Sequence, residues 1–407
     1  MTTTAGTATL PLYPGDRPAH CPFDPPDVYS GARGKPGLLR VRLWNDTTSW
    51  VVTRYDDVRT ALADPRLSAD MYRPGMPMIR PGSEAVTGQA AGFVRMDDPE
   101  HARLRRMVVK DFTAKRVQAM QPRVQAVVDE ALDALTSHDR AADLVHDFAL
   151  PVSSAVVCLL LGVPYEDHRF FQEQTAIVNS LTSSTEEAGA ARSALLDHLR
   201  QLVAHKEHTP ADDLISRLLA DQVAEGSLSH EELVVMIRMM LSTGHETVGN
   251  TIALGALALL LHPGQLRQLR DTDDPAVAEG AVEEILRYTS VVENPMIRVA
   301  AEDVVIGGQL VRAGEGLFIS LLTGNRDPGF TVDPDTLDIH RDAREHLTFG
   351  RGTHQCPAQH LARLEIRLAL SSLLRKVPTL RLAVPFERVR FKERASIYGL
   401  RELPVAW

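Results

Sequence analysis

The sequence predicts a mainly α-helical protein with small β patches, and three observations support this prediction. Apolar residues recur at helical spacing through most of the chain between residues 56 and 374. Strand-like stretches are short, and they gather at 39–53, at 297–321 and near the C-terminus. The 407 residues contain no internal repeat, low-complexity tract or obvious linker, so we predict one large domain over 1–407.

Taken in order along the chain, residues 1–35 are rich in Pro, Gly and Asp and predict an irregular N-terminal arm. The turn-like residues 45–48 predict a hairpin over 39–53, and Gly307-Gly308 predicts a second hairpin over 304–311. Residues 66–97 show little periodicity, and so long a loop inside a compact domain is usually functional. Helices are expected at 56–63, 98–112, 115–136, 152–161, 166–181, 187–206, 211–220, 229–262, 275–288 and 357–374.

Composition and charge exclude several functions. The chain is 44% apolar and 24% charged, which is ordinary for a globular protein. It has 44 Lys and Arg residues against 53 Asp and Glu residues, and the net charge of −9 disfavours general nucleic-acid binding. Aromatic residues make up only 5%, which argues against stacking platforms for single-stranded nucleic acid.

The cysteine count and the apolar stretches indicate the setting in which the protein works. Cys21, Cys158 and Cys356 are too few for a disulfide framework and favour a reducing compartment. The N-terminus lacks the basic and apolar regions of a secretory signal. The longest uncharged stretch, 148–165, is interrupted by prolines and predicts a buried helix, not a membrane span. We therefore expect a cytoplasmic monomer that binds neither membranes nor nucleic acid.

The most informative segment is the glycine-rich loop 346–356, which runs directly into a predicted helix. Pro357 suits the first helical position, so Cys356 stands at a helix N-terminus, where the helix dipole favours a thiolate. Gly350 and Gly352 allow close approach of a bulky group or a turn with positive φ. A thiolate in such a loop serves either as a nucleophile or as a metal ligand.

Several interpretations of this loop are open from the residues alone. The simplest is a free cysteine in a helix-capping loop. A zinc site is disfavoured, because zinc needs about four ligands and only His354 stands beside Cys356. A cysteine nucleophile is disfavoured, because a histidine two residues away is poorly placed as its base. An axial thiolate to haem iron needs one cysteine only, and we favour this interpretation.

The long predicted helix over 229–262 has a polar segment at its centre. Apolar stretches bracket residues 242–247, and burying hydroxyls and a carboxylate between them is costly unless they are paired or functional. Gly244 weakens the helix there and can open its hydrogen-bond ladder. Glu246 and Thr247 are an acid beside an alcohol, which together can relay protons into a buried site. The alternative is a solvent-facing turn of an amphipathic helix.

Taken together, these features resemble one family. The loop that ends at Cys356 resembles the haem-binding signature of the cytochrome P-450 monooxygenases, and 243–247 resembles their oxygen-activation motif. By spacing alone, Glu284 and Arg287 are an ordinary i,i+3 pair. In this context they resemble the family's buried Glu-x-x-Arg pair, and Arg341 falls where the third member of that network is expected. The motifs occur in the same order as in the family, and shorter stretches of the sequence are similar to those of soluble actinomycete members.

The resemblance implies a fold, a cofactor and a set of site residues. The fold is a single large cytochrome P-450-type α domain with small peripheral β-sheets. The cofactor is haem b, and Cys356 supplies the thiolate ligand of its iron. The implied roles are cofactor binding for His101, Arg105, Arg298, His354, Phe349 and Gly350; catalysis for Thr243, Gly244, Glu246 and Thr247; and structure for Glu284, Arg287 and Arg341.

Two positions depart from the family pattern. Thr243 stands where alanine is more common and adds a hydroxyl near the distal pocket. Ala358 stands where the signature usually has glycine, and we expect haem binding to survive this change. The substrate pocket is expected to be mostly apolar and to include Phe93, Val94, Met240, Thr243, Val292, Asn294, Met296 and Ile397.

We therefore interpret the chain as a haem-dependent monooxygenase that hydroxylates or epoxidises a bulky apolar molecule with O2. Similar actinomycete members act on polyketides and macrolides, which points to the tailoring of antibiotics. No flavin or iron–sulfur domain is recognisable, so ferredoxin and ferredoxin reductase are the expected electron donors. Their docking patch is expected at Arg103, Arg106, Arg344, Arg351 and Arg363.

Three alternatives stand beside this interpretation. One is a haem-binding or sensor protein without catalysis, which would not need the Glu246–Thr247 pair. Another is a xenobiotic- or steroid-type hydroxylase of the same family. The last is a cysteine-nucleophile hydrolase, which would bind no haem.

Overall fold

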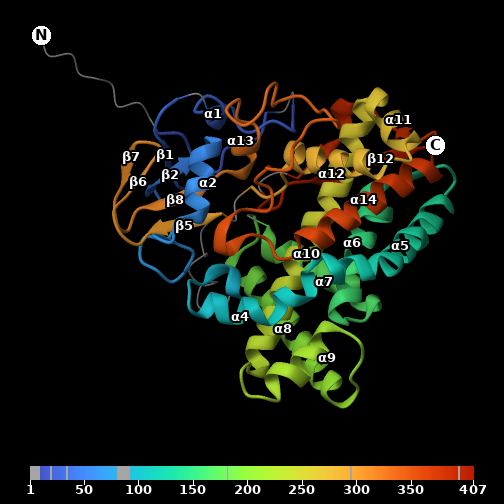
Figure 1. Cartoon of the computed structure of the whole chain (residues 1–407), viewed down its shortest axis with the longest axis horizontal. Coiled ribbons are helices and arrows are strands. Elements are labelled where there is room, and N and C mark those ends of the chain that lie inside the picture. Colours follow the sequence, from blue (N-terminus) through green and yellow to red (C-terminus); the bar gives the residue numbers. More distant parts are fainter. Residues whose placement is uncertain are drawn as a thin grey trace, which may run out of the picture.

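The computed structural model describes residues 10–18, 21–33, 35–79, 92–180, 182–293, 296–392 and 395–407. Helices fill most of the molecule, and a five-stranded sheet lies to one side of them (Figure 1). This confirms the predicted mainly helical fold with small peripheral sheets. The α-helices are α1 (Asp27–Ser30), α2 (Tyr55–Ala63), α4 (Glu100–Val109), α5 (Ala114–Thr136), α6 (Leu150–Leu161), α7 (His168–Asn179), α8 (Thr185–His208), α9 (Leu214–Leu218), α10 (His230–Leu261), α11 (Pro263–Asp271), α12 (Pro275–Thr289), α13 (Leu321–Asn325) and α14 (Gln359–Lys376).

The five-stranded sheet has the order β1-β2-β8-β5-β3. β1 (Leu39–Arg42) and β2 (Thr48–Val52) form the first predicted hairpin. β2 runs parallel to β8 (Gly316–Ile319), which is antiparallel to β5 (Ile297–Ala300), and β3 (Leu67–Ser68) pairs with β5 at the edge. The smaller sheets join β6 (Val304–Ile306) to β7 (Gln309–Val311), β10 (Arg390–Phe391) to β11 (Leu400–Glu402), and β12 (Pro404–Ala406) to both β4 (Ala141–Asp143) and β9 (Arg381–Leu382).

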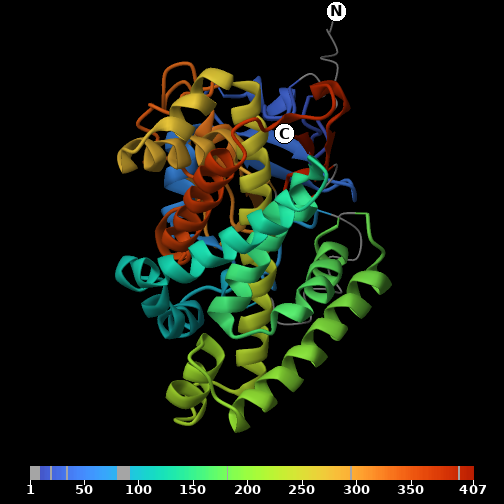
Figure 2. The same cartoon turned by 90° about the vertical axis from the view of Figure 1, so that its right-hand side faces the viewer.

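The 32-residue helix α10 runs through the middle of the molecule, as Figure 2 shows. Its start is fixed by a capping box, in which Ser229 and Glu232 satisfy each other's backbone N–H groups. Nearly all of its side chains are buried, because α6, α8, α12 and α14 pack around it. A helix that is apolar on every side belongs in a core, so the length and environment of α10 follow from its sequence.

Several helical segments differ from the sequence prediction, among them α11 and α9. α11 was not expected, because the prediction placed no helix between residues 262 and 275. Pro263 is instead the first residue of a new helix, a position where its missing N–H costs nothing. The helix expected over 211–220 is shorter, since α9 ends at Leu218 and a π-helical turn continues over Leu219–Val223.

The N-terminal arm packs against the body of the protein over its described residues. Leu12 bridges to Arg42 beside β1, and the ring of Tyr13 stacks on Phe318 of β8 at 3.8 Å between centroids. Apart from α1, the arm has no regular helix in the residues described between 10 and 33.

In the described part of the chain, no single helix is long and apolar enough to cross a membrane. α10 and α11 meet that criterion only as a pair, and they are bent by 113° at their junction.

Candidate active site

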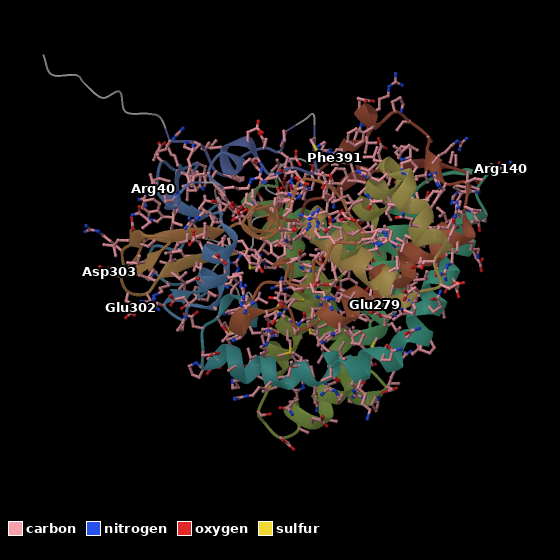
Figure 3. The ribbon with its side chains drawn as sticks, turned by 45° about the horizontal axis from the view of Figure 1, so that its top comes forward. Arg40, Arg140, Glu279, Glu302, Asp303 and Phe391 are labelled. Carbon is pink, nitrogen blue, oxygen red and sulfur yellow. The ribbon has the colours of Figure 1, made fainter. Side chains whose placement is uncertain are left out.

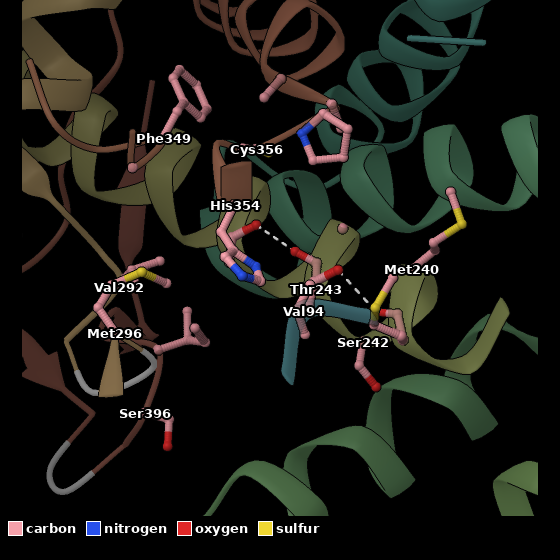
Figure 4. Close-up of a pocket in the computed structure, with 18 of the residues that line it drawn as sticks. Val94, Met240, Ser242, Thr243, Val292, Met296, Phe349, His354, Cys356 and Ser396 are labelled. Carbon is pink, nitrogen blue, oxygen red and sulfur yellow. Dashed lines mark hydrogen bonds between the residues drawn. The ribbon is translucent and has the colours of Figure 1, made fainter. Parts of the chain in front are cut away.

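A cavity of about 550 Å³ lies between α10 and the loop that precedes α14. Cys356 lies on its loop side, and Thr243, Gly244 and Thr247 of α10 line it as well (Figure 4). The wall is mostly apolar and is contributed by segments from across the whole chain, from Met71 to Ile397. The fold therefore gathers the two central sequence motifs around one enclosed space.

The cysteine loop is held by its own backbone. The N–H of Cys356 donates to the carbonyl of Phe349 at 2.8 Å, and the N–H of Gly350 donates to Leu347 at 2.7 Å. Gly352 has φ of 74°, and a Cβ at this position would lie 2.9 Å from the carbonyl oxygen of Leu62. Any other residue at Gly352 would clash with α2, so glycine is required for the loop to dock there.

The protonation of Cys356 differs from the sequence prediction. Burial raises the pKa of the thiol, and this outweighs the Ala358 N–H and the nearby Arg105 and Arg363, which lower it. The helix begins only at Gln359, two residues later than predicted. Burial therefore works against the thiolate that the helix terminus favours. A bound metal ion would favour the thiolate, because a coordinating thiol loses its proton.

A buried cationic cluster lines the cavity near the cysteine loop. The predicted residues His101, Arg298 and His354 meet there, and the two imidazole rings are 4.1 Å apart. Burial, followed by the charges of Arg298 and His101, lowers the pKa of His354 to about 3. Burial also lowers the pKa of Arg298 to about 10. Arg105 lines the same cavity, so all four predicted polar groups share it.

The sequence analysis missed Arg95, which belongs to this cluster. Arg95 ends a short 3-10 turn at Phe93–Arg95 and lines the cavity. Burial, with a contribution from Arg298, lowers its pKa to about 10. The only sequence signal was its place in the irregular segment 66–97. Desolvated cations gathered in one spot call for an anionic partner.

The polar centre of α10 remains helical. The hydroxyl of Thr243 donates to the Met239 carbonyl at 2.8 Å, and that of Thr247 donates to the Thr243 carbonyl at 2.7 Å. Such bonds to the preceding turn satisfy both hydroxyls without breaking the ladder. The helix assignment is continuous through Gly244, so the opening expected there does not occur.

Glu246 does not share the cavity with Thr247. It is absent from the residues that line this space, although it was predicted to line the oxygen site. Its carboxylate instead accepts a hydrogen bond from Nζ of Lys392 at 2.9 Å. Adjacent positions on a helix point about 100° apart, so an acid next to an alcohol in sequence does not face the same side.

The structure brings together the three residues for which the resemblance implies a structural role, Glu284, Arg287 and Arg341. The guanidinium of Arg287 donates to both carboxylate oxygens of Glu284, at 2.7 and 2.8 Å, and both side chains are fully buried. Nε of Arg341 donates to Glu284 at 3.2 Å. Arg287 also donates to the carbonyls of Asn325 and Pro334, so the network ties α12 to the segment after α13.

Most of the predicted substrate wall lines the cavity. Figure 4 shows Val292, Met296 and Ser396 on one side and Met240 on the other. Asn294 lies outside the described residues. The described members of the predicted wall that line the cavity are Phe93, Val94, Met240, Thr243, Val292, Met296 and Ile397.

Glu365 of α14 is a further lining residue that the sequence analysis missed. Burial raises the pKa of its carboxyl well above the usual range. It stands between Leu361 and Leu368 on the apolar stripe of α14. A carboxylate among the apolar residues of a helix is the sequence feature that could have identified it.

The comparisons with known proteins agree with this site. The family model described as Cytochrome P450 matches residues 35–204 and 180–379. The chain is 48% identical to Cytochrome P450-SU2 and 43% identical to Vitamin D3 dihydroxylase, both from Streptomyces griseolus, and each match covers 100% of this chain and at least 99% of the relative. The structure of the mycinamicin VIII C21 methyl hydroxylase MycCI from Micromonospora griseorubida aligns with a TM-score of 0.93 at 36% identity, covering 98% of this chain and 100% of that one.

A thiol-bearing loop facing a long central helix across one cavity is the site of a cytochrome P450 monooxygenase, and the chain belongs to the Cytochrome P450 family. Within that family it falls in the CYP105 group of actinomycete enzymes. The family implies a haem with a cysteine thiolate ligand.

The residues present fit such a cofactor. Nε2 of His101 is buried and makes no hydrogen bond within the described residues, and Arg298 is buried beside it. Anionic carboxylates of a haem would satisfy these groups. A haem iron needs only one thiolate from the protein, and Cys356 is the cysteine that lines the cavity among the described residues.

Proposed function

We propose that this monooxygenase holds haem b through Cys356 and inserts one oxygen atom into a bulky, largely apolar secondary metabolite of polyketide or macrolide type. The observation that carries the proposal is the single cavity shared by Cys356, Thr247 and the buried cationic cluster. The reaction is a hydroxylation or an epoxidation.

His101, Arg105, Arg298 and His354 would hold the haem carboxylates, and Arg95 joins them in this role. Phe349 would pack on the thiolate side: its carbonyl accepts the N–H of Cys356, and the guanidinium of Arg363 lies 4.6 Å from its ring centroid. When bound, a haem with a cysteine ligand supplies the activation of O2 and the transfer of one oxygen atom.

Thr247 is the group of the chain best placed to handle protons in the cavity. Its hydroxyl lines the cavity while donating to the carbonyl of Thr243, so its oxygen can still accept a hydrogen bond from water or a bound oxygen species. Thr243 adds a second hydroxyl one turn earlier. Together they orient water at the reacting face and hold protons there.

The substrate class follows from the composition of the wall. Phe93, Met240, Val292 and Ile397 offer apolar contact. Ser242 and Ser396 are polar lining residues that could contact substrate oxygens. The relatives named above act on vitamin D3 and on mycinamicin VIII, which are consistent with a bulky substrate. A steroid-like molecule is therefore the second candidate.

The electrons are proposed to come from a ferredoxin and its reductase. The family model and the full-length relatives account for the described fold without an attached redox domain within these 407 residues. In this proposal the donor protein approaches the thiolate side of the site, because substrate and O2 occupy the other.

The proposal is tested with purified, haem-loaded protein. The reduced CO complex should show a strongly red-shifted Soret band, and mycinamicin VIII and vitamin D3 serve as probes for a substrate-induced spectral shift. A probe that shifts the spectrum should gain one oxygen atom from isotopically labelled O2 when ferredoxin and reductase are added. A normal CO band with no shift for either probe would overturn the substrate class, and absence of the band would overturn the haem-thiolate assignment.

A further inference from the structure

Two short segments that lie far apart in sequence form one wall of the cavity. Residues 291–293 follow α12, and residues 396–398 precede β11 near the C-terminus. Val292 and Ile397 are paired in an antiparallel bridge, and both line the cavity. Only two backbone hydrogen bonds are seen between the segments, from Glu293 to Ser396 at 3.2 Å and from Tyr398 to Val291 at 2.7 Å.

Arg17 of the N-terminal arm joins these two segments. Its side chain is only 4% exposed. The guanidinium donates to the carboxylate of Glu293 and to the carbonyl of Ser290 at 3.3 Å on the first segment. On the second segment it lies over the ring of Tyr398, 3.6 Å from the centroid. Three stretches far apart in sequence thus meet at one buried charge.

The arm holds Arg17 in place. The guanidinium also donates to the carbonyls of Pro22 and Phe23, at 3.3 and 3.4 Å. Phe23 in turn packs against Tyr288 of α12 and Phe391 of β10, with ring centroids 5.3 and 6.3 Å apart. Arg17 is therefore held in place by the N-terminal arm, and it can in turn hold the Val292–Ile397 wall in place.

Such a clamp matters because the wall is weak without it. A two-stranded ladder with two hydrogen bonds is marginal by itself. A planar guanidinium that binds a carboxylate and stacks on an aromatic face fixes both partners at once. We propose that Arg17 is a positioning residue that sets the shape of the Val292–Ile397 wall, and through it the selectivity for bulky substrates. This rests on the proposed function, in which that wall contacts substrate.

A matched control exists elsewhere in the chain. Arg40 of β1 makes the same two kinds of contact, because it donates to Glu315 at 2.9 Å and lies 4.4 Å from the ring centroid of Trp50. None of these three residues lines the cavity. Figure 3 shows Arg40 at the outer sheet, well separated from Phe391, which marks the C-terminal hairpin.

The test compares two azole probes by spectral titration of the haem-loaded protein. Imidazole is too small to reach the wall, whereas clotrimazole is bulky. Losing about 1 kcal/mol of stacking and ion pairing should weaken clotrimazole binding to Arg17→Ala by about fivefold. Imidazole affinity and the CO band should not change. Arg40→Ala should leave the binding of both probes unchanged.

Further variants keep the test decisive. If Arg17→Ala does not fold, Arg17→Lys and Glu293→Gln replace it, and each should show part of the clotrimazole effect. In a double mutant cycle, Glu293→Gln should add little to Arg17→Ala, because the two side chains act as a pair. An unchanged clotrimazole affinity, or an equal loss for both probes, overturns the role of Arg17. A wild-type protein that binds neither azole would overturn the proposed function instead.

Discussion

Nζ of Lys392 donates to a carboxylate oxygen of Glu246 across 2.9 Å, and this ion pair joins α10 to the C-terminal hairpin. The N–H of Lys392 donates to the carbonyl of Gly399, so the lysine is fixed at the base of that hairpin. Ser396 and Ile397 of the same hairpin line the cavity. The acid of α10 is therefore tied to a segment that forms part of the substrate wall, while Thr247 beside it faces the cavity.

Thr247→Ala should uncouple the reaction. The variant should bind haem and substrate, because the hydroxyl bonds only to the carbonyl of Thr243. Without a hydroxyl to orient protons, it should consume reducing equivalents and release hydrogen peroxide in place of product. The measurement is peroxide formed per NADPH oxidised. Thr251→Ala, which removes the same kind of bond one turn later, should stay coupled.

Glu246→Gln should slow turnover with O2 and ferredoxin, roughly a hundredfold if the carboxylate delivers protons. Turnover driven by hydrogen peroxide should be retained, because peroxide brings its own protons. Lys392→Met removes the same ion pair but keeps the acid, and it should have only a small effect. If the two variants behave alike, Glu246 acts through its ion pair with Lys392 and not as a proton donor.

Cys356→Ala should lose both monooxygenase activity and the red-shifted CO band, because no other described cysteine lines the cavity. Cys158→Ala and Cys21→Ala should keep both properties. Cys158 is buried in α6, so its loss should cost about 1 kcal/mol of stability without moving the band. If Cys158→Ala or Cys21→Ala lost the red-shifted CO band while Cys356→Ala kept it, the cysteine whose loss removed the band would be the iron ligand instead.

Local features of the sequence predicted much of this fold and site. The span of α10 was predicted within one residue at each end, because its capping box and apolar pattern are local signals. The Glu284–Arg287 pair and the Gly350–Cys356 loop were found for the same reason. Each lies within one helix or one loop, and although spacing alone left its role open, the resemblance to family motifs singled it out.

Partners from distant segments could not be predicted in this way. Lys392 stands 146 residues from Glu246, and Arg17 stands 276 residues from Glu293. No spacing rule connects such positions, because only the packing of the whole chain brings them together. The same holds for the protonation of Cys356, where burial by distant segments outweighs the helix terminus.

Because of Glu283, the stability of the fold should decrease as the pH falls into the acid range. Burial would raise its pKa, but contacts from His346 and Arg363 reverse this and lower it to about 2. Nε of Arg363 donates to the carboxylate at 2.6 Å, and Nε2 of His346 lies 3.2 Å away from it. A lowered carboxyl pKa stabilises the fold above the unfolded value of 4.5, and this stabilisation disappears as pH falls toward about 2.

Thermal or urea unfolding between pH 6 and pH 2 measures this effect. The free energy of unfolding of the wild-type protein should fall by about 3 kcal/mol through Glu283 over that range. Glu283→Gln should be less stable than wild type at pH 6, and its free energy of unfolding should fall less steeply toward pH 2, so that its acid limb is flatter. Glu345→Gln is the control, because its ion pair with Arg351 spans 3.7 Å at the surface. Parallel acid limbs for wild type and Glu283→Gln would contradict the assignment.

Two arginines of the predicted docking patch, Arg103 and Arg363, are already paired within the protein. Arg103 donates to Glu100 at 2.8 Å and also pairs with Glu232. Arg363 is held by Glu283 and Phe349, so neither arginine offers a free charge.

Two arginines of the patch remain available to a partner. Arg106 is exposed on α4 and makes no ion pair with a described residue. The Arg351 side chain is 43% exposed at the edge of the cysteine loop, and its ion pair with Glu345 is a loose one at 3.7 Å. Arg344 is more exposed still, but Asp342 neutralises it through two hydrogen bonds.

The double variant Arg106→Glu/Arg351→Glu should slow ferredoxin-driven turnover several-fold. Arg351 belongs to the loop that carries Cys356, and the family resemblance implies the same side for Arg106. An acidic ferredoxin would dock there, and its steering depends on opposite charge. Arg344→Glu is the matched control and should have little effect, because its charge is already compensated by Asp342. Peroxide-driven turnover should be the same in all three proteins, and the difference between wild type and the double variant should shrink as salt rises. A loss in both assays would indicate damage to the site, whereas no loss in either would place the docking surface elsewhere.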